Sequence, residues 1–235
     1  MCIISRKWYN GYSHVNTYAP LTEHKVATLE VLRQPLKDRQ ITISRAKSVV
    51  TFPASFILVA ATNPCPCGFY GSHNPAHRCT CTPGQIHRYL HKISGPLLDR
   101  IDIQCHINAV SYEDLRGKAD GEPSVAIRER VCKAREIQNE RFRGTDIHCN
   151  AQMTPAMVRK YCQLDANGEA QLKLAMDMYG LSARAYDRIL KVARTIADLD
   201  SVVLPDRPVS NVLNVSHLLQ AIQFRQLDRA DWGEW

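Results

Sequence analysis

Four cysteines stand in two close pairs, Cys65-Pro66-Cys67 and Cys79-Thr80-Cys81, with residues 68–78 between them. Composition alone does not explain this clustering, because the other cysteines are scattered singly: Cys2, Cys105, Cys132, Cys149 and Cys162. Thiolates are preferred ligands of zinc in closed, four-coordinate structural sites. The two pairs therefore predict one metal site, with zinc as the expected ion and ligands Cys65, Cys67, Cys79 and Cys81.

The residues beside the cysteines favour the same interpretation. Pro64 and Pro66 stiffen the approach to the site, and Gly68 permits a tight turn after Cys67. The C-x-C spacing is tighter than the usual C-x-x-C knuckle. His73 and His77 lie between the pairs and remain alternative ligands, although a loop histidine is more often simply solvated.

The chain contains no apolar stretch long enough to span a bilayer, and its first residues turn polar too soon for a secretory signal. We therefore expect a cytoplasmic protein with no membrane partner. Thiols stay reduced in that compartment, so the paired cysteines favour a metal over disulfides.

The chain is long enough for one or two domains, with 235 residues of which 45% are hydrophobic. Its formal net charge of +7 makes acidic partners such as nucleic acid plausible. An excess of this size also serves solubility in many proteins, so charge alone does not decide between the two.

The elements expected around the cysteine loop are short strands and helices. An apolar run over 55–61 is typical of a fully buried central strand, and Ile101–Ile107 alternates as a half-buried strand does. A helix is expected from Val26 to about Gln34, where Pro35 would end it. Short β-branched runs over 41–43 and 48–52 predict a hairpin with a basic tip.

The second half of the sequence predicts helices almost without interruption. They are expected over 124–141, from Thr154-Pro155, over 168–178, over 182–199 and from Ser210 or Ser216 to Arg225. Residues 117–124 are typical of a flexible linker, and residues 1–26 show no clean period. The expected architecture is a mixed α/β portion followed by a helical portion.

Several of these motifs resemble the AAA+ ATPase module of the magnesium chelatase-like family, in its ComM/YifB branch. The resemblance covers about residues 27–225 and rests on the segments 29–36, 43–46, 63–68, 79–81, 94–102, 181–199 and 217–222. It implies the α/β class, with the C-terminal part of an AAA+ P-loop-type core over 27–116, a zinc-loop insertion at 64–82, a linker at 117–124 and an all-helical lid domain over 125–235. Residues 1–26 form an atypical N-terminal segment.

The resemblance also implies roles for single residues. Asn63 matches the sensor that orients the attacking water near the γ-phosphate of ATP, and Arg100 matches the arginine finger that reaches the ATP site of a neighbouring subunit. Arg184 matches the second sensor on the lid, and Arg188, one turn further, competes for that role. The hairpin tip, with Arg45 and Lys47, matches a hairpin that faces a central pore and contacts DNA.

Without the resemblance, each of these residues has a simpler explanation. Asn63 fits a strand-to-loop turn, Arg100 fits a surface ion pair, and Arg184 and a basic hairpin tip fit solvated positions. The family's partners and cofactors follow only from the resemblance: ATP with magnesium, DNA, and neighbouring subunits of a homo-oligomeric, hexameric ring that acts as a helicase or translocase.

Two motifs of a working module of this kind are missing. No G-x-x-x-x-G-K-[ST] phosphate loop occurs in the sequence, and residues 12–25 offer only the isolated Glu23 where an Asp-Glu pair at a strand end is expected. We therefore expect a C-terminal piece of a longer protein, with its first two dozen residues derived from a truncation or a shifted frame. This chain alone is not expected to bind ATP well or to hydrolyse it.

Two other functions remain open. The chain could be a stand-alone zinc-containing module that binds DNA or a protein through the cysteine loop and the hairpin. A subunit of a metal chelatase is a third function that the family name suggests, but the four-cysteine insertion favours the ComM-like branch.

Overall fold

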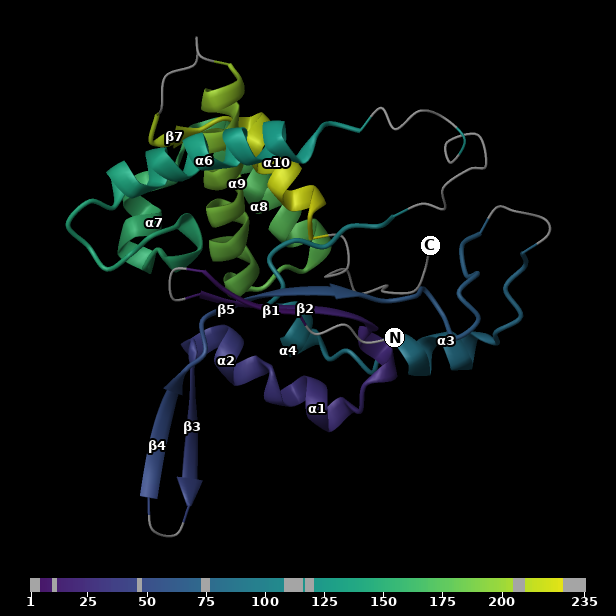
Figure 1. Cartoon of the computed structure of the whole chain (residues 1–235). Coiled ribbons are helices and arrows are strands. Elements are labelled where there is room, and N and C mark those ends of the chain that lie inside the picture. The colour runs from purple at the N-terminus through teal and green to yellow at the C-terminus, as the bar shows by residue number, and fades with distance from the viewer. Residues whose placement is uncertain are drawn as a thin grey trace. The chain divides into compact units, whose positions relative to one another are not determined.

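The computed structural model describes residues 5–9, 12–45, 48–72, 77–107, 116, 121–204 and 210–225. Contacts divide the chain into a first unit, Met1–Ile101 with Ala230–Trp235, and a second unit, Asp102–Arg229. The first unit contains strands with short helices, and the second is mainly helical (Figure 1). The mixed α/β class expected from the sequence is therefore confirmed.

The first unit contains a three-stranded sheet in the order β1-β2-β5. Strand β1 (Ser5–Tyr9) is antiparallel to β2 (Tyr12–Pro20), and β2 is parallel to β5 (Phe56–Ala61). The sequence showed no clean period over residues 1–26, yet most of this opening forms strands. A partner strand more than thirty residues away, which no local pattern shows, determines this structure.

Strand β5 is not the fully buried strand that its apolar run predicts. Ile57 is 57% exposed and Val59 is 53% exposed, while Phe56 and Leu58 are half-buried. Among the described residues, β5 pairs with β2 at one edge and with no strand at the other. An apolar run of this kind is buried only when neighbouring strands or helices cover both faces.

Two helices replace the single helix expected after Val26. Helix α1 (Val26–Val31) and helix α2 (Arg33–Asp38) meet at Leu32, and Arg39 ends α2 in the left-handed conformation with φ 55°. Pro35 does not end the helix as predicted, because it lies in the first turn of α2, where a backbone N–H has no helical partner to lose.

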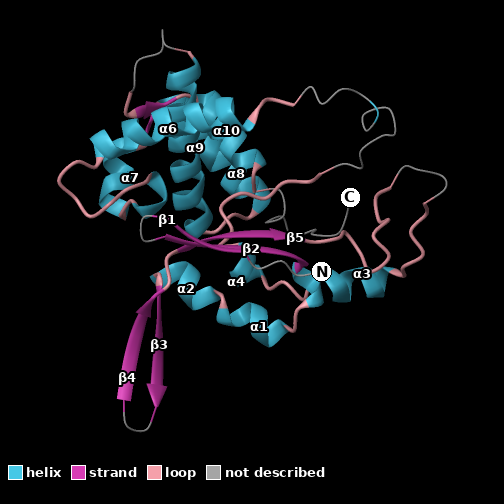
Figure 2. Cartoon of the chain, in the orientation of Figure 1, coloured by secondary structure: helices cyan, strands magenta, loops and turns pink. Residues whose placement is uncertain are grey.

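The predicted hairpin forms as β3 (Gln40–Arg45) antiparallel to β4 (Ser48–Pro53), with Ile41 opposite Phe52. Every described residue of both strands is exposed, and the hairpin extends from the sheet and helices of its unit as an arm (Figure 2). At its base, the N–H of Ala54 donates to the carbonyl of Arg39 over 2.8 Å.

Two short helices follow the cysteine loop. Helix α3 (Pro83–Leu90) starts with a capping box between Thr82 and Gln85, and helix α4 (Gly95–Leu98) is capped by Ser94. Leu97 and Leu98 pack with Ile93 and with Leu21 and Leu29 from before and within α1, which makes one small core.

The half-buried strand predicted over Ile101–Ile107 does not form. Residues 101–107 are without regular structure, and the N–H of Gln104 donates to the carbonyl of Phe224 over 2.8 Å. The predicted burial is reversed, since Gln104 is buried while Ile103 and Ile107 are exposed. Because these residues form no strand in the described structure, the alternating pattern has no sheet to face.

The second unit contains the helices that the sequence predicts: α6 (Ser124–Arg141), α7 (Pro155–Tyr161), α8 (Ala166–Tyr179), α9 (Ala183–Val203) and α10 (Val215–Gln223). Thr154 and Ser182 cap α7 and α9 through their side chains. Ser124 is the first residue of α6 and not its cap, which is Pro123, and α10 begins after Asn214. The sequence missed the parallel pair β6 (Gln163–Leu164) and β7 (Val212–Leu213).

Helix α9 lies at the centre of this unit, and its inner face is buried against α6, α7 and α10, while α8 packs on α10. A charged network lies in the same interior. Asp198, which is fully buried, accepts hydrogen bonds from Arg141 over 2.5 and 2.7 Å, from Arg194 over 3.2 Å and from Asn150 over 2.8 Å. Two guanidiniums and one amide therefore satisfy this buried carboxylate.

Among the described residues, no helix has the length and apolar character that crossing a membrane requires.

Candidate functional site

The cysteine loop begins where β5 ends. Cys65 is fully buried, and the N–H of Gly68 donates to the carbonyl of Cys65 over 3.1 Å, closing a turn in which Gly68 has φ 84°. This left-handed conformation favours glycine, as the sequence suggested. Beyond the second pair, the capping box at Thr82 starts α3 directly, so both cysteine pairs lie next to regular structure.

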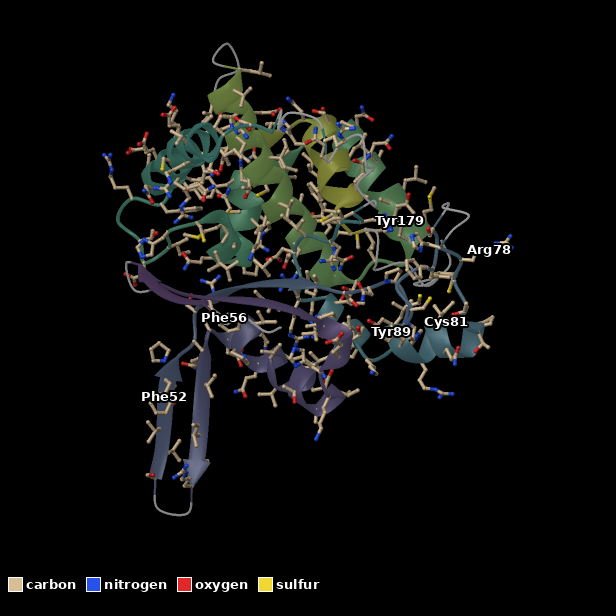
Figure 3. The ribbon with its side chains drawn as sticks, turned by 45° about the vertical axis from the view of Figure 1, so that its right-hand side comes forward. Phe52, Phe56, Arg78, Cys81, Tyr89 and Tyr179 are labelled. Atoms are coloured by element: carbon tan, nitrogen blue, oxygen red, sulfur yellow. The ribbon has the colours of Figure 1, made fainter. Side chains whose placement is uncertain are left out.

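Helix α3 packs against the cysteines. Its buried residues Ile86 and Leu90, one turn apart, form a small core with Cys65, and the other three cysteines pack at the edge of this core with Tyr70 and Tyr89. Figure 3 shows Cys81 and Tyr89 on the side of the molecule where α3 lies, with Arg78 nearby on the loop. The periodicity of Ile86 and Leu90 was readable in the sequence, but their packing on the cysteines was not.

The structure brings all four predicted ligands together. Their sulfur atoms lie within 4.8 Å of one another. The Sγ of Cys65 is 3.2 Å from that of Cys67 and 3.8 Å from that of Cys79, and the Sγ atoms of Cys67 and Cys79 are 3.6 Å apart.

Backbone N–H groups point at these sulfurs. Tyr70 donates to the Sγ of Cys65 over 3.3 Å. Hydrogen bonds from the backbone of Phe69 and then of Thr80 lower the pKa of Cys67 to about 6. At Cys79 the backbone hydrogen bond from Cys81 acts in the same direction, but burial and the neighbouring thiols outweigh it and raise the pKa to about 12. The close packing of the thiols therefore shifts the pKa of Cys67 and that of Cys79 in opposite directions.

This donor set fits a thiophilic metal. Sulfurs in a tetrahedral site with metal–sulfur bonds of about 2.3 Å are roughly 3.8 Å apart, which is close to the distances found here. The N–H donors supply the outer hydrogen bonds that metal thiolates normally receive. His77 does not join the group, because its exposed ring stacks on Phe69 with 4.9 Å between the centroids. His73 lies outside the described residues.

Asn63 is exposed just after the carboxyl end of β5. The preceding Thr62 donates to the carbonyl of Asn63 over 3.2 Å, and its hydroxyl lies 3.2 Å from that of Thr22, which is fully buried. The sequence missed Thr22 because its segment showed no period. Since β2 runs parallel to β5, the two strands end at the same edge of the sheet, where open α/β sheets bind ligands.

The end of β2 carries no carboxylates. It provides Ala19 and Pro20, while Glu23 follows as an exposed residue in the 3₁₀ turn Leu21–Glu23. The expectation that Glu23 has a non-strand context is correct for Glu23 itself. It is wrong for the residues before it, which form the parallel neighbour of β5.

Arg100 is half-buried and is held by backbone carbonyls. Its Nε donates to the carbonyl of Arg33 over 3.0 Å, and its Nη1 donates to the carbonyl of Pro96. Asp102 pairs with Arg188.

The two arginines that compete for the lid sensor role differ in their surroundings. Arg184 is exposed in the first turn of α9. Arg188 is half-buried, and its guanidinium donates to the carboxylate of Asp102. Of the hairpin residues, Arg45 is exposed at the end of β3, opposite Ser48, and Lys47 lies outside the described residues.

Comparison with known families identifies the chain. A family model described as magnesium chelatase, subunit ChlI, matches residues 18–115, and a second, for the C-terminal part of the same subunit, matches residues 121–225. The first match begins nine residues before the resemblance expected from the motifs, so the sequence interpretation placed its start too late.

Curated relatives agree with these matches. The chain is 41% identical over 211 residues to the competence protein ComM of Haemophilus influenzae and 39% identical over 211 residues to the uncharacterized protein YifB of Escherichia coli. It is 35% identical over 206 residues to an uncharacterized protein of Mycobacterium tuberculosis. These alignments cover 87–89% of this chain but only 38% of the length of each relative. The chain belongs to the magnesium chelatase-like family and has ComM and YifB among its homologues.

Proposed function

We propose that this chain is the C-terminal portion of a ComM/YifB-like AAA+ ATPase that acts on DNA as a hexameric ring in uptake and recombination. The observation that carries the proposal is the match of both family models in order along the chain, together with a relative that is named a competence protein. Because the sequence has no phosphate loop, the chain contributes to ATP hydrolysis without hydrolysing ATP itself.

Within this proposal, the nucleotide-facing residues have separate roles. Asn63 follows the strand edge at which α/β sheets bind ligands and orients water near the γ-phosphate. Arg100 stabilises transition-state charge at the ATP site of a neighbouring subunit. Arg184 is favoured over Arg188 as the lid sensor, since the guanidinium of Arg188 is engaged by Asp102.

The hairpin supplies the DNA contact. Its two strands are exposed throughout and extend as an arm, so Arg45 and Lys47 can approach a phosphate backbone. Ile43 and Val50 lie opposite each other on the same face as Arg45, and both are exposed.

The cysteine cluster holds zinc in this proposal. Four thiolates form a closed site with no open position for catalysis, so the ion would fix the loop between β5 and α3 and take no part in the reaction. When bound, zinc would supply the positive charge that lets all four sulfurs ionise.

An ATPase assay with mixed subunits tests the main proposal. The chain alone is expected to show no ATP turnover. It is expected to restore turnover to a variant of the Haemophilus relative in which the arginine matching Arg100 is replaced by alanine. An Arg100→Ala chain should restore none. Turnover by the chain alone, or equal restoration by Arg100→Ala, would refute the proposal.

DNA binding by the chain tests the role of the hairpin. Removing two phosphate contacts through Arg45→Ala with Lys47→Ala should reduce the slope of log K against log salt by roughly 1.5 to 2. Arg128→Ala with Lys133→Ala removes the same charge from exposed positions of α6 and serves as the matched control. Equal losses in the two double variants would indicate a contribution of net charge only.

The second candidate is a stand-alone zinc-containing module that binds DNA or a protein. The exposed hairpin and the clustered cysteines, both within the first unit, favour it. It predicts salt-sensitive DNA binding together with no effect on the ATP turnover of the longer relative. A metal chelatase subunit remains the weakest candidate, since a closed thiolate site has no position from which to deliver an ion.

A further inference from the structure

Arg100 is held by two segments that are far apart in the sequence. Its Nε donates to the carbonyl of Arg33, at the start of α2, over 3.0 Å, and its Nη1 donates to the carbonyl of Pro96 in α4. Both acceptors are backbone groups, so the direction of this guanidinium depends on where the two helix starts lie relative to each other.

One carboxylate joins these two helix starts. Glu30 in α1 accepts a hydrogen bond from the hydroxyl of Ser94 over 2.5 Å through one oxygen, and from the guanidinium of Arg33 through the other. The Ser94 hydroxyl also accepts from the N–H of Leu97 over 3.3 Å and thereby caps α4. Glu30 is therefore linked to the residue before α4 and to the residue that begins α2.

The apolar residues below fix this arrangement. Leu29, Ile93, Leu97 and Leu98 are buried together, so the backbone on both sides of Glu30 is packed. The hydrogen bond from Ser94, followed by that from Arg33, lowers the pKa of Glu30 below its usual value, and the charge of Arg100 acts in the same direction. Glu30 is thus a carboxylate at neutral pH that accepts hydrogen bonds from Ser94 and Arg33.

We propose that Glu30 is a positioning residue for Arg100: by joining Ser94 and Arg33, its carboxylate sets the two carbonyls that aim the Arg100 guanidinium. This inference rests on the proposed function in one respect: the oriented Arg100 acts at the ATP site of a neighbouring subunit. The positioning itself is a property of this chain and can be measured without ATP.

The first measurement is hydrogen exchange of the arginine Nε–H groups by NMR in the intact, metal-loaded chain. The Arg100 signal, identified by its loss in Arg100→Lys, is expected to exchange slowly. Glu30→Ala should accelerate its exchange at least tenfold, and Glu30→Gln should accelerate it less, because an amide oxygen still accepts from Ser94. Glu140→Ala is the matched control, since Glu140 pairs with Arg143 at the same i, i+3 spacing on an exposed surface.

The second measurement is the restoration of ATP turnover in the mixed-subunit assay. Glu30→Ala is expected to lower the restored kcat at least tenfold with KM for ATP unchanged, while Glu30→Gln recovers part of it and Glu140→Ala all of it. A KM effect would indicate altered assembly or nucleotide binding instead, and would count against positioning.

The outcomes separate the two proposals. If Glu30→Ala leaves both the exchange of Arg100 and the restored turnover unchanged, the positioning inference is overturned. If Arg100→Ala restores turnover as well as the unaltered chain does, the proposed function fails while the exchange result still decides the positioning. Should Glu30→Ala unfold the first unit, as judged by lost zinc and lost helix signal, Glu30→Gln decides alone: normal exchange in it overturns the inference.

Discussion

The two units of this chain bury their side chains in different ways. Among the residues whose side chains the structure describes, the second unit has one core of 12 buried residues, drawn from the helices, from the residues between and after α6 and α7, and from β7. In the same part of the chain, the first unit has two separate cores, of five and three buried residues, and leaves Ile57 and Val59 of its sheet exposed. Stability in the second unit comes from a continuous interior, whereas the first depends on local ties at the cysteines and around Glu30.

Their polar groups differ in the same sense. The second unit places Asp198 and two arginines in its interior, where each charge has a partner. The first unit keeps its ion pair between Glu30 and Arg33 partly exposed. Removing one residue of a buried network leaves an uncompensated charge in the interior and strongly destabilises the fold. Removing one residue of a partly exposed ion pair costs less, because water hydrates the remaining charge.

Removing the proposed zinc ion is the largest perturbation that this comparison predicts. Structural zinc contributes roughly 10–16 kcal/mol of apparent binding energy in small zinc domains, so chelation or Cys65→Ser should disorder the segment from Cys65 through α3. The expected result is one equivalent of zinc in the unaltered chain, little in the variant, and lost hydrogen-exchange protection over that segment. Protection in the second unit should be unchanged.

Cys132→Ser is the control for this experiment, because Cys132 is an exposed cysteine of α6. A metal-free chain in which the loop and α3 keep their full protection would show that the first unit has no need of the ion. The two units would then not differ in their need for a metal ion.

Asp198→Ala should produce the largest loss in the second unit. It leaves the guanidiniums of Arg141 and Arg194 buried without their carboxylate, a change that typically destabilises by about 3–5 kcal/mol. Urea unfolding followed by helix signal measures the loss. Asp177→Ala, at an exposed position of α8, should change the free energy of unfolding by less than about 0.5 kcal/mol. Similar values for the two variants would contradict a buried network.

Replacing one isoleucine by alanine in each unit compares how much a buried and an exposed apolar side chain contribute to stability. Ile189→Ala in α9 should cost about 2–5 kcal/mol, because that side chain is fully buried. Ile57→Ala in β5 should change the free energy of unfolding by only about 0.5 kcal/mol and should reduce self-association of the exposed strand. A loss above about 2 kcal/mol at Ile57 would show that something covers this face in solution.

The last prediction concerns the loss of stability in alkali that Cys162 causes. Burial raises the pKa of this thiol from 9.0 to about 11, although the charges of Arg194 and Arg141 oppose the shift. Its contribution is present below pH 9 and is lost as the pH rises towards 11, because the unfolded thiol ionises first. The two-unit shift corresponds to at most about 2–3 kcal/mol.

Comparing the pH dependence of unfolding for the unaltered chain and Cys162→Ala measures this contribution. Only the slope between pH 9 and 11 matters, since the variant also removes packing. Parallel curves over that range would exclude a role for the thiol.

Local patterns predicted those parts of the fold that local chemistry determines. Thr154 and Ser182 correctly predicted the starts of α7 and α9, and the β-branched runs on either side of the hairpin tip correctly predicted β3 and β4. The four ligands of the candidate metal site were readable because their spacing is a local feature of one loop.

Features that depend on distant partners could not be read in this way. Strand β2 forms because β5 offers an edge to it. The alternation over Ile101–Ile107 produces no strand, because no strand among the described residues pairs with it. The prediction that Pro35 ends a helix was wrong because proline is tolerated in the first turn of a helix, and a new helix, α2, begins two residues before it. The hydrogen bond from Ser94 to Glu30 joins residues 64 positions apart, and no local sequence pattern around either residue predicts it.

The parallel pairing of β2 with β5 also has a consequence for how the first unit folds. Asn16 pairs with Val59, so the helices α1 and α2 and the whole hairpin lie in the loop that this contact closes. Closing such a loop loses chain entropy before any pairing repays it, whereas the hairpin and the cysteine turn close over short distances. We therefore expect the arm and the cysteine loop to form in an early kinetic phase, and the sheet to form in a later, slower one.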